Sequence, residues 1–253
     1  MFSWLFKPSC PCEPRTKAWV EERLAWLSQE FGDGVYHGRT IILPTRAFFP
    51  DPFDATYETV RKMLDRVCGY MEVDPDFVEL DYFESPQNFY LVNRSGAYLP
   101  TAPAETYHEE DGKYIISIDS RSVHNPFDLV GTFAHELAHA RLLGEQRVDR
   151  EIYDNELLTD LTVVHQGLGI FLANSPRAWH SQMSTWPDGE PGRPEYMSLA
   201  MYGWALSLLG WFREEPKPSW LSALNMDAKV NVQQGLRYLF ATGDSTYTPR
   251  SLR

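Results

Sequence analysis

The chain has 253 residues, and its 35 acidic and 23 basic side chains give a formal net charge of -12. This excess of carboxylates argues against nucleic acid or an anionic membrane as a partner, because both select clustered Lys and Arg. Its length allows a full hydrophobic core in a single domain, and its aromatic content of 14% is typical of a globular protein.

The N-terminal segment, MFSWLFKPSC, has a short apolar stretch with no basic residues before it, which is unlike a secretory signal. No apolar run approaches the roughly 20 residues that span a bilayer. The odd number of cysteines favours a reducing compartment, and Cys10 and Cys12 have no further ligands nearby for a structural metal. We therefore expect a cytoplasmic protein with no membrane partner.

The first 120 residues mix helical and strand patterns. Apolar residues at helical spacing predict helices over residues 16–31 and 55–70. Short runs of strand-forming residues predict strands at 40–43 and 77–83.

A hairpin is expected next. The dipeptide Asp111-Gly112 is a typical two-residue hairpin turn, and it would join residues 97–108 to a strand at 113–119.

Helical patterns dominate the rest of the chain. Asn125 before Pro126 is typical of a helix start, and Gly144 is typical of a left-handed C-terminal cap, so a helix is predicted over 126–143. Asp154 or Asn155 can cap the next helix. The further expected elements are helices over 155–174, 197–212 and 227–240, with a long loop over 176–194.

Strands followed by helices indicate an α+β fold, with a small mixed or antiparallel sheet and then a helical half. We expect one domain over residues 1–253, with an N-terminal α/β part at about 1–120 and a helical part at about 121–245.

The strongest chemical signal is His135-Glu136-Leu137-Ala138-His139, which lies inside a predicted helix. Residues four apart on an α-helix point about 40° apart and lie one turn from each other, so both imidazoles can bind one metal ion. Glu136 lies beside them and can take a proton from a metal-activated water, which is the general-base role that this motif serves in zinc peptidases.

A catalytic zinc site needs a third protein ligand. Glu156 and Asp160 are also four residues apart on a predicted helix, so both can face the histidine helix. Glu156 is the expected third ligand, and Asp160 is expected to accept the free imidazole N–H of one ligand histidine.

His135, Glu136 and His139, followed by Glu156 and Asp160, resemble the gluzincin metallopeptidases, the thermolysin-like group. The resemblance covers about residues 113–174 and implies a single zinc ion and a sheet whose edge strand holds an extended peptide. On this basis residues 114–119 are the candidate edge strand. The downstream histidine motif that steadies the tetrahedral intermediate in thermolysin-like enzymes has no match in this chain.

Other residues compete for roles in such a site. Glu145 is the main rival third ligand, because it follows His139 by six residues, the spacing of the last ligand in metzincins, although Leu142 replaces the glycine that those enzymes need. The candidates for the donor that stabilises the oxyanion are Tyr153, Tyr196, Tyr202 and Arg193.

The remaining polar residues have ordinary interpretations. His165 is expected to be structural, because it points about 180° away from Glu156 around their helix. The expected solvated loop charges are Asp149, Glu151 and Asp154, and the expected isolated histidines are His37, His108, His124 and His180.

The sequence thus predicts a zinc-dependent hydrolase, specifically a metallopeptidase that acts on a peptide or protein substrate. His135, His139 and Glu156 would hold one Zn²⁺, and Glu136 would be the catalytic base. The alternative is a non-catalytic regulatory or interaction module that keeps the zincin fold and its metal site.

Overall fold

The computed structural model describes residues 8–84, 91–92, 98–99, 106–177 and 184–249, and the side chains of all of these except 35, 37, 91, 92, 98, 99 and 106. This part of the chain divides into two compact units. The first comprises the described residues within Met1–Leu43, Val164–Pro176 and Met197–Arg253, and the second comprises those within Pro44–Val163 and Arg177–Tyr196. The helix that carries the histidine motif belongs to the second unit, together with the sheet.

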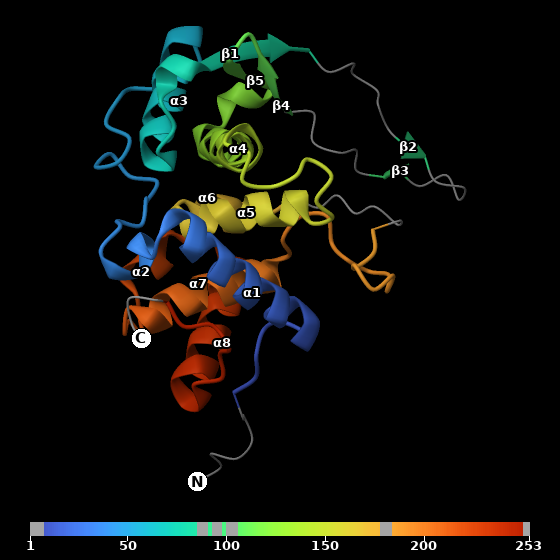
Figure 1. Cartoon of the computed structure of the whole chain (residues 1–253). Helices are drawn as coiled ribbons and strands as arrows, with labels where there is room; N and C mark the ends of the chain where they lie inside the picture. The colour runs from blue at the N-terminus through green and yellow to red at the C-terminus, as the bar shows by residue number, and fades with distance from the viewer. Residues whose placement is uncertain (1–7, 85–90, 93–97, 100–105, 178–183, 250–253) are drawn as a thin grey trace. The chain divides into compact units, whose positions relative to one another are not determined.

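The first unit is helical. Its elements are α1 (Pro14–Phe31), α2 (Gly34–His37), α6 (Gly169–Asn174), α7 (Leu199–Phe212), the 3-10 helix η4 (Ser219–Ala223) and α8 (Met226–Thr242). α7 is buried on nearly all sides and packs against α8, as Figure 1 shows in orange and red. Gly235 of α8 lies so close to Ser207 of α7 that any Cβ at position 235 would collide with it. The predictions of helices at 16–31, 197–212 and 227–240 are confirmed.

Two predictions near this unit are wrong. Residues 40–43 form no strand, because Ile42 N–H donates a single hydrogen bond to Gly167 at 3.0 Å and no strand lies beside it in the described chain. The helix expected over 155–174 is two helices, α5 (Asn155–His165) and α6. Gly167 separates them with a φ of 91°, a conformation that glycine adopts without steric cost.

The second unit holds a three-stranded mixed sheet of order β1-β5-β4, formed by β1 (Val78–Phe83), β4 (Thr106–Glu110) and β5 (Lys113–Asp119). β1 runs parallel to β5, with Val78 opposite Tyr114, and β4 runs antiparallel to β5, with Tyr107 opposite Ile116. Asp111 and Gly112 have φ values of 49° and 76°, so the predicted hairpin turn is confirmed as the left-handed type that matches strand twist. Residues 97 and 100–105 of the expected partner strand lie outside the described residues.

The second unit also contains helices and two short strands. The other elements of the unit are α3 (Tyr57–Met71), the 3-10 turns η1 (Pro75–Phe77) and η2 (Ser122–His124), the short strands β2 (Leu91–Val92) and β3 (Tyr98–Leu99), α4 (Pro126–His139), the π-helical turn η3 (Ala140–Gly144) and most of α5. α3 packs against α4; in the view of Figure 1, α4 lies below the sheet and α3 lies to the left of both. Residues 177 and 184–194 contain no helix or named strand, as the loop prediction requires.

α4 begins as predicted and ends differently. Asn125 Oδ1 accepts a hydrogen bond from Phe127 N–H at 3.1 Å, and Pro126 takes the first helical position. After His139 the backbone widens into the π turn, in which Glu145 N–H donates to the Ala140 carbonyl at 3.0 Å. The positive φ, 55°, is at Gln146 and not at Gly144, so the predicted left-handed cap at Gly144 is wrong.

Along the described residues, no helix combines the length and the apolar character needed to cross a membrane.

Candidate metal centre

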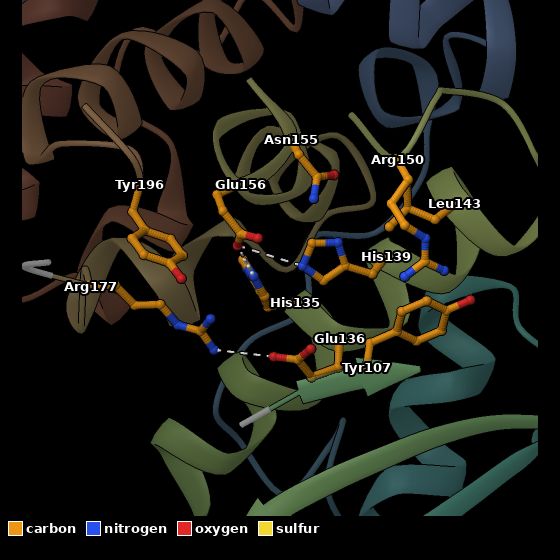
Figure 2. Close-up of a pocket in the computed structure, with 10 residues that line it drawn as sticks. All are labelled: Tyr107, His135, Glu136, His139, Leu143, Arg150, Asn155, Glu156, Arg177 and Tyr196. Atoms are coloured by element: carbon orange, nitrogen blue, oxygen red, sulfur yellow. Dashed lines mark hydrogen bonds and ion pairs between the residues drawn. The ribbon is translucent and has the colours of Figure 1, made fainter. Parts of the chain in front are cut away.

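Two histidines of α4 and one glutamate of α5 form a compact donor cluster within the second unit. His135 and His139 are 1% and 6% exposed, and together with Glu156 they offer ligand atoms that all lie within 4.8 Å of one another. Figure 2 shows the Glu156 carboxylate beside both imidazoles. The helical spacing of four residues places both rings on one side of α4, as the sequence predicted.

The distances from Glu156 to the two histidines are close to those of a tetrahedral metal site. Glu156 Oε2 lies 3.0 Å from His135 Nε2 and 3.6 Å from His139 Nε2. Tetrahedral ligands on bonds of roughly 2.0 to 2.1 Å lie about 3.3 Å from each other. These two distances lie on either side of this value, and all three ligand atoms lie within 4.8 Å of one another, so these residues could hold a metal ion.

The second nitrogen of each imidazole has its own partner on α5. His135 Nδ1 lies 2.9 Å from Asp160 Oδ1, and His139 Nδ1 lies 3.2 Å from Thr159 Oγ1. Thr159 donates its hydroxyl hydrogen to the Asn155 carbonyl at 2.8 Å, so its oxygen is available to accept from His139 Nδ1–H. Asp160 and Thr159 can each accept the Nδ1–H of their histidine, which directs Nε2 at the cluster; this is the arrangement that metal-binding histidines require once Nε2 is deprotonated.

The electrostatics of the metal-free cluster show how strongly its groups interact. Burial and the Arg177 charge oppose protonation of His135, but its bonds to Asp160 and Glu156 prevail and raise its pKa to about 9. Burial likewise opposes the Glu156 carboxylate, yet hydrogen bonds and charge attraction from His135 and His139 hold its pKa well below the ordinary value. In the metal-free cluster, a protonated His135 is therefore paired with the Glu156 and Asp160 carboxylates.

Glu136 lies next to the cluster without belonging to it. Its side chain is 2% exposed, lines the same pocket, and has Oε1 3.6 Å from Arg177 Nη2. The Arg177 guanidinium also lies 5.4 Å from the centre of the Tyr196 ring. Burial, followed by the charge of Glu156, raises the pKa of Tyr196, so its phenol stays protonated and able to donate. Figure 2 shows Arg177 and Tyr196 together on one side of the pocket.

The pocket around the cluster has a volume of about 290 Å³. Its lining residues are Tyr107, His135, Glu136, His139, Leu143, Arg150, Asn155, Glu156, Arg177 and Tyr196. Tyr107 of β4 stacks on His139, with ring centres 6.1 Å apart and planes 22° from parallel. Such a concave site with convergent polar groups is the usual form of a ligand pocket.

Gly144 allows the close fit of the pocket wall. A Cβ at this position would lie 2.5 Å from Tyr114 Cε1 and 2.7 Å from Tyr107 Oη. Glycine is therefore required at position 144 because Tyr107 and Tyr114 approach it closely, and not because it caps a helix.

Most rival site residues lie elsewhere. Glu145 forms ion pairs with Arg141 at 2.6 Å and Arg147 at 2.7 Å, and it is not part of the donor cluster. His165 is in the first unit, 2% exposed, against Phe31 and Tyr36, as its structural interpretation predicted.

Among the loop charges, Asp149 and Glu151 are exposed as expected. Asp154 is 0% exposed, so the prediction of a solvated charge is wrong there; it precedes α5, and its carbonyl accepts the Leu158 N–H. His108 and His124 are exposed, whereas the side chains of His37 and His180 lie outside the described residues.

Only Tyr196 of the predicted oxyanion donors lines the pocket. Tyr153 is exposed, Tyr202 belongs to the first unit, and Arg193 donates to the Thr185 carbonyl at 3.0 Å.

The predicted edge strand is also wrong. β5, which contains residues 114–119, is the central strand of the sheet, and β4 is the edge strand that contributes Tyr107 to the pocket. Sequence reasoning missed Tyr107, Arg150, Thr159 and Arg177. Only Thr159 had a usable signal, its spacing of three residues from Glu156 on the same helix.

Comparison with protein-family models, with curated proteins and with solved structures finds no match to this chain. The cluster, its partners and the pocket are therefore interpreted from their own geometry.

Proposed function

We propose that this chain is a zinc-dependent hydrolase that cleaves peptide bonds, with His135, His139 and Glu156 as ligands of one Zn²⁺ and Glu136 as the general base. The observation that carries the proposal is the donor cluster, within 4.8 Å, beside a buried carboxylate in one pocket. The resemblance of the two motifs to those of gluzincins agrees with it.

The donor set favours zinc in a catalytic role. Two imidazoles and one carboxylate are a known catalytic zinc set, and three protein ligands leave the fourth tetrahedral position for water or substrate. When bound, zinc would polarise the scissile carbonyl and lower the pKa of water to near neutrality.

Glu136 is placed to move the proton. It shares α4 with the two histidines but lies outside the ligand set, and it lines the pocket. In this proposal it takes the proton of the attacking water and returns it to the leaving amine. The ion pair with Arg177 at 3.6 Å would hold the carboxylate in position.

Arg177 and Tyr196 are the proposed donors to the oxygen that becomes negative during attack. Both line the pocket, and both can donate a hydrogen bond. Donors fixed in advance around a developing oxyanion are a major source of rate enhancement. This pair would serve in place of the downstream histidine motif that the chain lacks.

β4 is the proposed support for an extended substrate. Among the described residues, β4 pairs with β5 on one side only, which leaves its outer edge available for a peptide strand. Tyr107 lies on this strand and stacks on His139, so a peptide bound along the edge would pass beside the cluster.

A peptide-library digest tests the proposal. Zinc-loaded wild-type protein should cleave a subset of peptides, Glu136→Gln should lose cleavage while zinc stoichiometry stays near one, and Glu156→Gln should lose the zinc. Glu145→Gln is the matched control and should keep both properties, because Glu145 is outside the cluster. Unchanged turnover in Glu136→Gln would refute the mechanism, and full zinc occupancy without any cleavage would favour the non-catalytic module.

A further inference from the structure

Two arginines line the pocket from different segments of the second unit. Arg150 lies between η3 and α5, and Arg177 follows α6 in the chain. Figure 2 shows them on opposite sides of the cluster, with Arg177 near Glu136 and Tyr196, and Arg150 near His139 and Tyr107. Two cations at one pocket are unexpected in a chain with a net charge of -12.

The two arginines differ in their surroundings. Arg177 has Glu136 at 3.6 Å and the Tyr196 ring at 5.4 Å. Arg150 is exposed, and in the described part of the chain no hydrogen bond or ion pair links it to another residue. No described carboxylate thus forms a salt bridge with the Arg150 guanidinium.

The Arg150 charge acts inside the pocket. Burial raises the pKa of the Tyr107 phenol, the bond to Glu109 adds to this, and the Arg150 charge opposes it. The guanidinium is therefore close to the Tyr107 wall, which also stacks on His139. The other charged members of the lining are Glu136, Glu156 and Arg177. Glu136 pairs with Arg177, and Glu156 pairs with His135 and His139, so neither carboxylate of the lining forms an ion pair with Arg150.

We infer that Arg150 binds a carboxylate of the substrate, so that the protein prefers peptides with a negative charge next to the scissile bond. A guanidinium presents a planar fork of N–H donors that matches a carboxylate with two parallel hydrogen bonds. Arg150 and the donor cluster line the same pocket of about 290 Å³, so a carboxylate bound by Arg150 would lie close to the scissile bond. This inference rests on the proposed hydrolytic function.

The carboxylate has two possible sources, the side chain of an Asp or Glu residue and the free C-terminus of a peptide. Four synthetic peptides separate them: acidic with an amidated C-terminus, neutral with a free C-terminus, neutral and amidated, and basic and amidated. The variant is Arg150→Gln. The matched control is Arg147→Gln, which removes the same charge from the same connecting segment but lies outside the pocket lining.

We expect the zinc-loaded wild-type protein to cleave at least one of the carboxylate-bearing peptides with a kcat/KM roughly tenfold or more above the neutral amidated one, the effect of a hydrogen bond to a charged group. Arg150→Gln should lower this ratio to near one, and Arg147→Gln should keep it. Preference for the acidic amidated peptide identifies a side chain, and preference for the free C-terminus identifies a terminal carboxylate. Equal rates for all four peptides in the wild type would overturn the inference while leaving the proposed hydrolysis standing.

A binding measurement separates this inference from turnover. Propionohydroxamic acid and the monohydroxamate of succinic acid share a metal-binding group and differ in one carboxylate. Calorimetric titration of the zinc-loaded protein should show tighter binding of the succinic compound, by roughly tenfold or more, and Arg150→Gln should remove that difference. If this holds but no peptide is cleaved, Arg150 binds carboxylates and the proposed hydrolysis fails. If the two compounds bind equally to the wild type, the inference is wrong.

Discussion

In the metal-free protein a proton competes for the place of the metal ion. Both ring nitrogens of His135 face carboxylates, at 2.9 Å for Asp160 and 3.0 Å for Glu156, so both can donate only if the ring is protonated. Its pKa is accordingly raised to about 9 against the opposing effects of burial and Arg177. A metal ion needs the Nε2 lone pair and must displace this proton.

The pKa of His135 sets how much zinc affinity this proton costs. At about pH 7, two units below the pKa of about 9, only about one molecule in a hundred has the neutral His135 ring. Zinc affinity is therefore expected to be about 100-fold below its high-pH limit, equivalent to about 2.7 kcal/mol. Between about pH 7 and about pH 9, His135 alone should make the affinity rise about tenfold per unit, with about one proton released per zinc.

Calorimetric titration with zinc in two buffers of different ionisation enthalpy gives the number of protons released, and competition with a chelator gives the affinity at each pH. Asp160→Asn is the informative variant, because it removes a carboxylate that raises the His135 pKa and also orients the ring. It should weaken high-pH affinity by roughly 10-fold to 100-fold. Asp160→Asn should also make zinc affinity depend less on pH, so that the difference in affinity between the variant and the wild type becomes smaller towards neutral pH. A zinc affinity independent of pH, with no proton released, would show that zinc does not displace a proton from His135.

Three further predictions concern single side chains. Thr159→Val should weaken zinc binding by about tenfold, because it leaves His139 Nδ1–H buried without an acceptor; an unchanged chelator competition curve would contradict this. Gly144→Ala should lower the free energy of unfolding in urea by about 1 to 3 kcal/mol, because its Cβ would overlap the Tyr114 ring and the Tyr107 hydroxyl. Gly69→Ala on α3, where a Cβ meets nothing within 4 Å, should not lower it. Burial, followed by the charge of Arg39, lowers the His165 pKa to about 4, so His165 stays neutral in the fold while the unfolded chain takes up a proton below about pH 6.5. The contribution of neutral His165 to the free energy of unfolding is complete above about pH 6.5 and is lost as the pH falls towards about 4, by up to about 3 kcal/mol. Urea unfolding of His165→Gln should lack this pH dependence; if it is retained, another group causes it.

The donor cluster could be predicted because helix geometry fixes it. Two pairs of residues at a spacing of four, His135 with His139 and Glu156 with Asp160, each lie on one face of a helix, and both faces meet in the structure. The hairpin at Asp111 was equally predictable, since its turn chemistry is local.

What the sequence did not predict depends on tertiary arrangement. Strand order placed β4 and not β5 at the sheet edge, and no periodicity encodes that order. Arg150 and Arg177 come from irregular segments, where spacing gives no direction for a side chain. The break between α5 and α6 at Gly167 was missed because the apolar stripe continues through it and an isolated glycine does not always end a helix.

The most direct test of a zinc-dependent hydrolase is to titrate the metal-free protein with zinc while following cleavage of a peptide selected from the library digest. We expect no cleavage without zinc, a linear rise in cleavage up to one equivalent, and no further rise beyond it. Glu136→Gln should bind the same equivalent of zinc and remain inactive. Cleavage that does not depend on added zinc, or a filled zinc site that cleaves no peptide, would contradict the proposed function.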